Sequence, residues 1–375
     1  MRVEKILLRD FRCYEEAEVT FDPSVNIICG ENAAGKTNLL ESVYYFSAMK
    51  PLRTVRERET VRYGAEVAYL EATVNSGGRE KVLTSCISSK GGKRLTRNGV
   101  KLKTSGEMLG DLRTVVFSPE DLYIVKGASA ERRRLLDRAI CQLRPSYWAA
   151  LNEYNRIIVQ KQKILKNREE KPSLLELLPS YNERLAHFAG TLISVRSSYV
   201  AKLSQLAAEC SASLSAGRDV LSLEYRTLSN IPSPKGMDVN DIRCAVGEHL
   251  RSHYAAELAS GSCLSGPHKD DISIFVNGTD AKSFASQGQT RTASLALKLA
   301  EREIFFRDTG EYPVLLLDDV LSELDPVRQS GVLNRIEGGQ VLITCCSSEA
   351  QPLGGRLITV HRGRISEVRD IVKAK

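Results

Sequence analysis

The sequence lacks the apolar segments that a membrane protein or a secreted protein needs. No run of apolar residues reaches the roughly 18 residues that cross a bilayer. Residues 1–5 lead directly into a strand-like pattern, without the apolar core of a signal peptide. We therefore expect a cytoplasmic protein with no membrane segment.

Cysteine pairs of the C-x-x-C type are also missing. The nine cysteines are scattered along the chain, and the adjacent Cys345 and Cys346 cannot easily bridge each other. A disulfide scaffold is excluded, and we expect reduced, mostly buried thiols in a reducing compartment.

Aromatic residues make up only 6% of the chain, with a single tryptophan. The content of 42% hydrophobic and 26% charged residues is nevertheless that of an ordinary globular protein. Because 375 residues exceed what one hydrophobic core usually holds, we expect two lobes.

Positive charge is in small excess and is concentrated in one segment. The net charge of the chain is +7, and residues 126–171 alone contain twelve Lys and Arg against five acidic residues. A solvated helix face and a DNA-binding surface both explain such a segment, and the sequence leaves the two open. The run Arg132, Arg133 and Arg134 supplies candidate phosphate contacts.

The aromatic residues of this segment favour one mode of DNA recognition. Tyr147, Trp148 and Tyr154 fit the packing face of a helix better than a platform for stacked bases. We therefore expect contacts to the backbone of duplex, gapped or junction DNA, and no base readout.

The two ends of the chain have α/β character. Two alternating strands open the sequence, an apolar strand over 25–29 precedes a glycine-containing loop and a helix, and hairpins fill residues 68–102. After Gly266 a strand pattern returns, followed by a helix over 290–306 and apolar strands over 313–318 and 340–344.

The middle of the chain is helical, with breaks at Pro145, Pro172 and residues 231–236. We predict an α/β fold in which residues 1–125 and 263–375 form one lobe. Residues 126–262 form an inserted helical arm.

Residues 30–37 fit the phosphate-loop pattern G-x-x-x-x-G-K-[ST] in full, between a strand and a helix. Glycines let backbone amides face phosphate oxygens, and the helix N-terminus favours an anion. Lys36 is expected to hold the β- and γ-phosphates of a nucleotide, and Thr37 a Mg²⁺ ion.

An apolar strand over 314–317 ends in two carboxylates, Asp318 and Asp319. Alone, this is a common turn, but beside a phosphate loop it predicts catalysis. We expect Asp318 to bind Mg²⁺ through water and Asp319 to polarise the attacking water. Residues 286–289 begin a helix and, taken alone, would be an ordinary N-cap.

Together these motifs resemble the ABC-type P-loop ATPase head, in the branch with SMC proteins. Five further segments resemble the RecF family of bacterial recombination mediators, nearly end to end: residues 8–14, 116–122, 131–134, 266–271 and 318–325.

The resemblance implies a weak DNA-dependent ATPase that dimerises on ATP and binds DNA. It also implies action with RecO and RecR to load RecA in gap repair, replication restart and SOS induction. Catalytic roles fall to Asp319, Asp318 and Lys36, Mg²⁺ binding to Thr37 and Asp318, a D-loop to residues 322–325, and a nucleotide contact to Arg53 and Thr54. ATP binding falls to Gly30, Glu31, Asn32, Ala33, Ala34, Gly35, Lys36, Thr37, Asn38, Ser286, Gly288 and Gln289.

The chain departs from the wider ABC pattern at two places. Residues 118–121 replace a glutamine lid, and Thr344, Cys345 and Cys346 stand where a switch histidine is usual. We therefore expect slow turnover. His268, beside Asp270 and Asp271, is either structural or catalytic.

Two other functions compete with a repair ATPase. The ATP-binding subunit of a membrane transporter is disfavoured by the helical insertion and by the missing lid and histidine. A scaffold that binds ATP without hydrolysis is disfavoured because Asp319 keeps a carboxylate where hydrolysis needs one.

Overall fold

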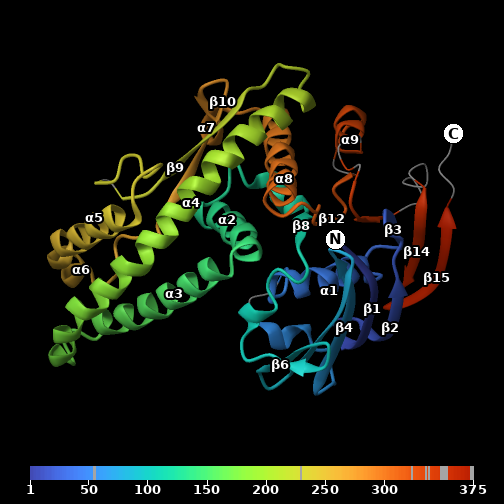
Figure 1. The fold of residues 1–375 in the computed structure, drawn as a ribbon, viewed down its shortest axis with the longest axis horizontal. Helices are drawn as coiled ribbons and strands as arrows, with labels where there is room; N and C mark the ends of the chain where they lie inside the picture. The colour runs from blue at the N-terminus through green and yellow to red at the C-terminus, as the bar shows by residue number, and fades with distance from the viewer. Residues whose placement is uncertain are drawn as a thin grey trace. The chain divides into compact units, whose positions relative to one another are not determined.

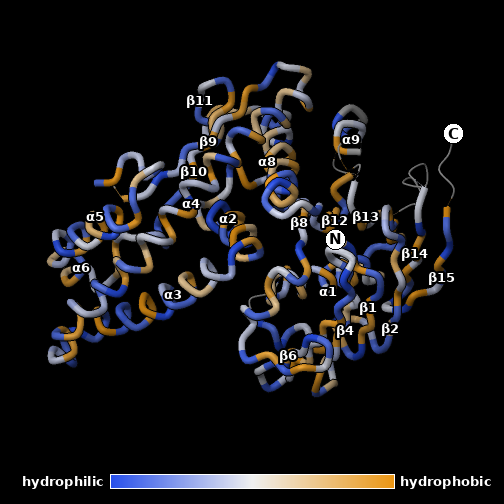
Figure 2. Tube along the Cα trace, viewed as in Figure 1, coloured by the Kyte–Doolittle hydropathy of each residue, from blue (hydrophilic) through white to orange (hydrophobic). Residues whose placement is uncertain are grey.

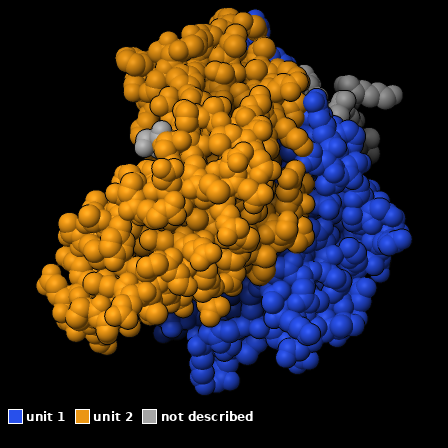
Figure 3. Space-filling model, turned by 60° about the vertical axis from the view of Figure 1, so that its left-hand side comes forward, with its two compact units in different colours: residues 1–123, 213–216, 294–375 blue, residues 124–212, 217–293 orange. Residues whose placement is uncertain are grey.

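The chain folds into two compact units, which Figure 3 colours separately. The computed structural model describes residues 1–53, 56–228, 230–321, 324–333, 336, 338–346 and 354–371. Unit 1 consists of residues 1–123, 213–216 and 294–375, and unit 2 of residues 124–212 and 217–293. No helix in the described part of the chain is both long enough and apolar enough to cross a bilayer.

Unit 1 begins with an antiparallel sheet in the strand order β2-β1-β4-β5-β6-β7. Along the fourth strand of the chain, Ala68, Leu70, Ala72 and Val74 are fully buried, and the residues between them are half-buried. The predicted hairpins are confirmed. The strands are β1 (Arg2–Phe11), β2 (Tyr14–Thr20), β4 (Val67–Ser76), β5 (Arg79–Ser88), β6 (Lys93–Arg97) and β7 (Val100–Lys101).

The second sheet of unit 1 has the order β15-β14-β3-β13-β12-β8 (Figure 1). Its strands are β3 (Val25–Cys29), β8 (Thr114–Phe117), β12 (Val314–Leu317), β13 (Val341–Cys345), β14 (Gly355–His361) and β15 (Arg364–Ile371). All pairs are parallel except β14 with β15. Because β13 lies between β3 and β12, the carboxyl ends of these three strands meet at one edge, where open α/β sheets bind ligands.

The helices of unit 1 connect and cover these sheets. The first, α1 (Lys36–Ala48), is buried along most of its length, including Leu39, Leu40 and Val43. The others are α9 (Pro326–Leu333), η1 (Glu57–Thr60), η2 (Ser105–Glu107) and η3 (Pro119–Tyr123).

Unit 2 is mainly helical and also contains the small antiparallel sheet β11-β10-β9. Apolar and polar residues alternate along α3 and α4, as Figure 2 shows. Pro145 occupies the first turn of α3, where its missing amide hydrogen costs no bond. The elements are α2 (Ser129–Leu143), α3 (Pro145–Lys166), η4 (Pro172–Leu177), α4 (Leu178–Leu214), β9 (Leu221–Arg226), α5 (Val239–Ser252), α6 (Tyr254–Ser260), β10 (Asp271–Val276), β11 (Thr279–Asp280), α7 (Ala281–Phe284) and the start of α8 (Gln287–Thr309). The end of α4 and residues 294–309 of α8 belong to unit 1.

Three features differ from the expectations. Strand β9 interrupts the segment predicted as helical, and strands β14 and β15 follow the last predicted strand. Residues 263–293 lie in unit 2 and not with the C-terminal half of unit 1, because β10 pairs with β9. The thiols are not mostly buried, since Cys13, Cys244 and Cys346 are exposed.

Candidate functional site

The phosphate-loop pattern forms a tight loop between β3 and α1, where glycine is required twice. A Cβ atom on Gly30 would lie 2.3 Å from the carbonyl oxygen of Val360 on β14. Gly35 has φ 119°, a conformation that other residues rarely adopt. Gly35 is also the N-cap of α1, and no side chain of the described residues caps this helix. The first amides of α1 are therefore left for an anion.

Lys36 points back into the loop that precedes it. Its Nζ donates to the carbonyl oxygens of Gly30 at 2.8 Å and Glu31 at 3.0 Å, and the residue is 4% exposed. The loop therefore encloses a fixed positive charge, as a phosphate site needs.

Asp318 is the point where three segments of unit 1 meet. Thr37 Oγ1 on α1 donates to its carboxylate at 2.7 Å, and Thr344 Oγ1 on β13 donates at 3.0 Å. Arg53 adds an ion pair at 2.8 Å. Asp318 is 1% exposed, so these donors compensate the burial of its charge. Residues 281 positions apart in sequence, Thr37 and Asp318, are thus brought into direct contact.

Asp319 borders a cavity of about 250 Å³ above the loop. Its φ of 52° turns the chain sharply after β12, and its backbone amide donates to Thr344 Oγ1 at 2.8 Å. Thr344 therefore links the two aspartates. The cavity is lined by Asn32, Ala33, Ala34, Gly35, Lys36, Thr37, Asn38, Arg53 and Asp319.

Arg53 is held in place by an ion pair that the sequence reasoning missed. Glu41 on α1 is 1% exposed, and Arg12 donates to both of its carboxylate oxygens, at 2.7 and 2.9 Å. The same carboxylate accepts the backbone amide of Leu52 at 2.8 Å, directly before Arg53. An acidic residue between apolar positions of a predicted buried helix was the available signal.

Known proteins are similar to this chain along most of its length. The model of the RecF/RecN/SMC N terminal domain matches residues 2–365. The DNA replication and repair protein RecF of Listeria welshimeri is 40% identical over 353 residues, covering 93% of this chain and 94% of that protein. The chain belongs to the RecF family.

Two further RecF proteins support this assignment. RecF of Bacillus subtilis is 37% identical, covering 92% of this chain and 94% of that protein. A solved structure of the recombination mediator protein RecF-ATP in the RecFOR pathway is 34% identical, with a TM-score of 0.89 over 99% of this chain and 97% of that chain. The resemblance and the predicted α/β head with an inserted helical segment are confirmed.

The third predicted motif of this RecF-family chain, residues 286–289, lies at the start of α8, in unit 2. Ser286 Oγ accepts the amide of Gln289 at 3.2 Å, and Gln289 Oε1 accepts the amide of Ser286 at 3.1 Å. This reciprocal pair is a capping box. Gln289 also donates to Asp219 at 3.1 Å, and Gly288 lies inside the first turn. The phosphate loop lies in unit 1.

Three residues predicted in this family's motifs lie outside the described residues: Thr54, Ser322 and Glu323. Of the D-loop segment, Leu324 is buried, and Asp325 accepts the amide of Arg328 at 3.0 Å at the start of α9.

Of the three arginines predicted as phosphate contacts, only Arg132 is buried, while Arg133 is half-buried and Arg134 is exposed. Arg132 is 2% exposed, pairs with Asp271 at 2.7 Å and donates to the carbonyl oxygen of Gly127 at 2.8 Å. Arg133 donates to the carbonyl oxygen of Asp270 at 2.6 Å, and Arg134 pairs with Glu131.

His268 also belongs to the interior of unit 2. Its Nδ1 is 2.7 Å from the hydroxyl of Tyr154 on α3, and burial lowers its pKa to about 4. Burial raises the pKa of Asp270 to about 6, against hydrogen bonds from Tyr225 and Thr227. The half-buried position of His268 and its contact with Tyr154 favour a structural role over a catalytic one.

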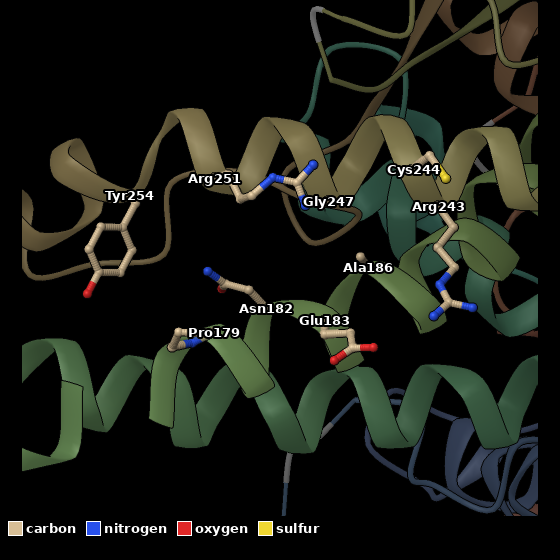
Figure 4. Close-up of a pocket in the computed structure, with 9 residues that line it drawn as sticks. All are labelled: Pro179, Asn182, Glu183, Ala186, Arg243, Cys244, Gly247, Arg251 and Tyr254. Carbon is tan, nitrogen blue, oxygen red and sulfur yellow. The ribbon is translucent and has the colours of Figure 1, made fainter. Parts of the chain in front are cut away.

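Unit 2 also contains a cavity of about 810 Å³ that the sequence did not predict (Figure 4). It is lined by Pro179, Asn182, Glu183 and Ala186 of α4, Arg243, Cys244, Gly247 and Arg251 of α5, and Tyr254 of α6.

Proposed function

We propose that this chain is an ATP-dependent DNA-binding recombination mediator and a weak DNA-dependent ATPase. It acts in the cytoplasm in gap repair, replication restart and SOS induction, with RecO and RecR, to help load RecA. The observation that carries the proposal is the contact of Thr37 with Asp318 beside Lys36, which joins the phosphate loop to the acidic strand end.

The ATP site consists of the phosphate loop and the lining of the small cavity. Lys36 supplies the counter-charge of the phosphates, and the amides of residues 30–38 supply hydrogen bonds. Membership of the RecF family supports ATP as the nucleotide, because the solved relative is described with ATP.

Thr37 and Asp318 fit a Mg²⁺ ion, since a hydroxyl and a carboxylate are hard oxygen ligands and lie within 2.7 Å of each other. When bound, the ion neutralises phosphate charge. Arg53 holds the second carboxylate oxygen of Asp318 and thereby fixes its orientation.

Asp319 is the group that accepts a proton from the attacking water. Its backbone is held by Thr344, which also holds Asp318. Thr344 donates its one hydroxyl hydrogen to Asp318 and carries no positive charge, so it cannot stabilise a phosphate as the imidazolium of a switch histidine would. We expect slow hydrolysis for this reason.

The arm is proposed to contact DNA through the exposed lysines of the basic segment. Lys126, Lys163, Lys166 and Lys171 are exposed. Phosphate contact by such residues is electrostatic and independent of sequence.

Binding of an ATP analogue to Lys36→Ala tests the proposal. We expect loss of tight binding in a chain that still folds, because the lysine balances phosphate charge and its hydrogen bonds to carbonyl oxygens stay within the loop. Cys244→Ser, on the surface of unit 2, is the control. Wild-type affinity in Lys36→Ala would contradict the proposed site.

A further inference from the structure

Two thiols meet at the base of the phosphate loop. Cys29 ends β3, Cys345 ends β13, and the two residues are direct partners across these parallel strands. Their Sγ atoms lie 2.9 Å apart. Neighbouring strands run about 4.8 Å apart, and disulfides form between Cα atoms roughly 4.4–6.8 Å apart. The two cysteines therefore satisfy the spacing that a disulfide needs.

Both cysteines are next to residues of the candidate ATP site. Cys29 directly precedes Gly30. Cys345 directly follows Thr344, which holds both aspartates. The next residue, Cys346, donates from Sγ to Asn32 Oδ1 at 3.0 Å and lies 3.6 Å from Lys36 Nζ. A bond between the two thiols would thus join the strand end that carries the loop to the strand end that carries Thr344, which holds the acidic pair.

We infer that Cys29 and Cys345 form a reversible disulfide when a hydroperoxide is present, and that this bond restrains the phosphate loop. The Cys29 thiolate attacks one peroxide oxygen, the O–O bond breaks, and a sulfenic acid and water form. Cys345 then attacks the sulfenic sulfur, and a second water leaves. In total, two thiols lose two electrons and two protons, and hydrogen peroxide becomes two water molecules.

The surroundings of the two sulfurs differ. The hydrogen bond between the thiols lowers the pKa of Cys29, burial opposes this effect, and the nearby charge of Lys36 lowers the pKa further. The same hydrogen bond raises the pKa of Cys345, with burial as the next cause. Cys29 therefore has the greater thiolate character, and the disulfide formed is the same whichever sulfur reacts first.

The disulfide should weaken nucleotide binding, a consequence that rests on the proposed function. Bond formation shortens the sulfur separation from 2.9 Å to about 2.05 Å. Gly30, directly after Cys29, packs closely against the carbonyl oxygen of Val360 on β14, so a pull of Cys29 toward β13 would disturb this contact at the start of the loop. We expect at least tenfold weaker binding of an ATP analogue, restored by dithiothreitol.

Disulfide mapping tests the bond itself. Trypsin places Cys13 with Cys29 in residues 13–36, and Cys345 with Cys346 in residues 336–356. In a Cys13→Ser/Cys346→Ser chain, each peptide keeps one cysteine. After hydrogen peroxide and N-ethylmaleimide, we expect these peptides to be linked, two hydrogens lighter than their sum. If both remain separate and carry the maleimide at a dose that oxidises exposed Cys244, the inference is wrong.

Binding measurements test the coupling. In Cys345→Ser, and in Cys345→Ala as a second variant, affinity for the ATP analogue should no longer respond to peroxide. A mapped disulfide with unchanged affinity would overturn the restraint of the loop. Absence of binding by reduced wild-type chain would overturn the proposed function, while the peptide masses would still decide whether the bond forms.

Discussion

Thr344 serves two acidic residues with one hydroxyl group. It donates to Asp318 at 3.0 Å and accepts the amide of Asp319 at 2.8 Å, from a strand that lies between those of the loop and the acidic pair. Thr344→Val removes both hydrogen bonds, each worth about 1 kcal/mol. We expect ATP turnover to fall about tenfold or more.

Thr344→Ser is the matched variant, because it keeps the hydroxyl and loses only a methyl group. It should retain most of the turnover. Equal turnover by the Val variant and wild type would show that the hydroxyl does not position the aspartates.

His268 makes unit 2 sensitive to acid. Its pKa is about 4 in the folded chain, against an ordinary 6.5, so between these values the unfolded chain binds a proton that the folded chain does not. Stability therefore falls as pH falls through this window, by about 3 kcal/mol. Asp270 has the opposite effect, since its pKa is raised to about 6 and its contribution grows as pH falls.

His268→Gln should remove the loss of stability that protonation of His268 causes, and leave the opposite effect of Asp270 in place. The unfolding free energy of the variant, relative to wild type, should rise by about 3 kcal/mol from pH 7 to pH 4. Urea unfolding followed by Trp148 fluorescence measures this, because the single tryptophan lies in unit 2. His187→Gln, on the exposed side of α4, is the control. Parallel pH profiles of wild type and His268→Gln would refute the assignment.

At the scale of elements, we expect DNA binding to depend on exposed lysines of α3 and of the segment after it. Lys163, Lys166 and Lys171 are exposed on α3 and after it. Replacing all three by Gln should lower the slope of log affinity against log salt by about 0.9 for each phosphate of duplex DNA that one of these lysines neutralises. Filter binding between low and physiological salt measures the slope.

Arg132→Ala on α2 should affect the stability of unit 2 and not the salt dependence of DNA binding. It removes the ion pair with the partly exposed Asp271 and the hydrogen bond to the carbonyl oxygen of Gly127, and should destabilise unit 2 by about 1–3 kcal/mol. If the salt slope is unchanged in the variant with all three lysines replaced, these lysines do not contact DNA.

Most strands and helices followed from local patterns, and the failures have physical reasons. Strand β9 has Leu221, Leu223 and Tyr225 in alternation, but it lies among helices and pairs with β10 about 50 positions later. The structural role of Arg132 could not be predicted either, because its partner Asp271 is 139 positions away in the sequence. The charge of a residue also does not indicate whether its side chain is buried. By contrast, the contact between Thr37 and Asp318 was predictable, since parallel strands place their carboxyl ends together.

At the scale of the whole molecule, the phosphate loop and the acidic pair lie in unit 1, whereas residues 286–289 lie in unit 2. We expect each ATP site to be completed by a second copy of the chain, in a head-to-tail dimer with two-fold symmetry. Ser286→Arg should prevent ATP-dependent dimerisation and hydrolysis, yet leave ATP binding by the monomer nearly intact. Gel filtration with ATP and with ADP measures the dimer.

Asp319→Asn should have the reverse effect and accumulate an ATP-bound dimer that hydrolyses slowly. Full hydrolysis by Ser286→Arg at low protein concentration would mean that one chain completes its own site.

The pairing of β3 with β13 also determines when the chain can fold during synthesis. Cys29 on β3 and its partner Cys345 on β13 are 316 positions apart in the sequence. At about 5–20 residues per second, a ribosome needs roughly 15–60 s to cover that distance. The antiparallel sheet of residues 2–101 and all of unit 2 emerge earlier. Until β13 is synthesised, the backbone amide and carbonyl groups of β3 should remain unpaired at both edges of the strand. We therefore expect chaperones to bind the nascent chain chiefly at β3 and to release it once β13 has left the ribosome.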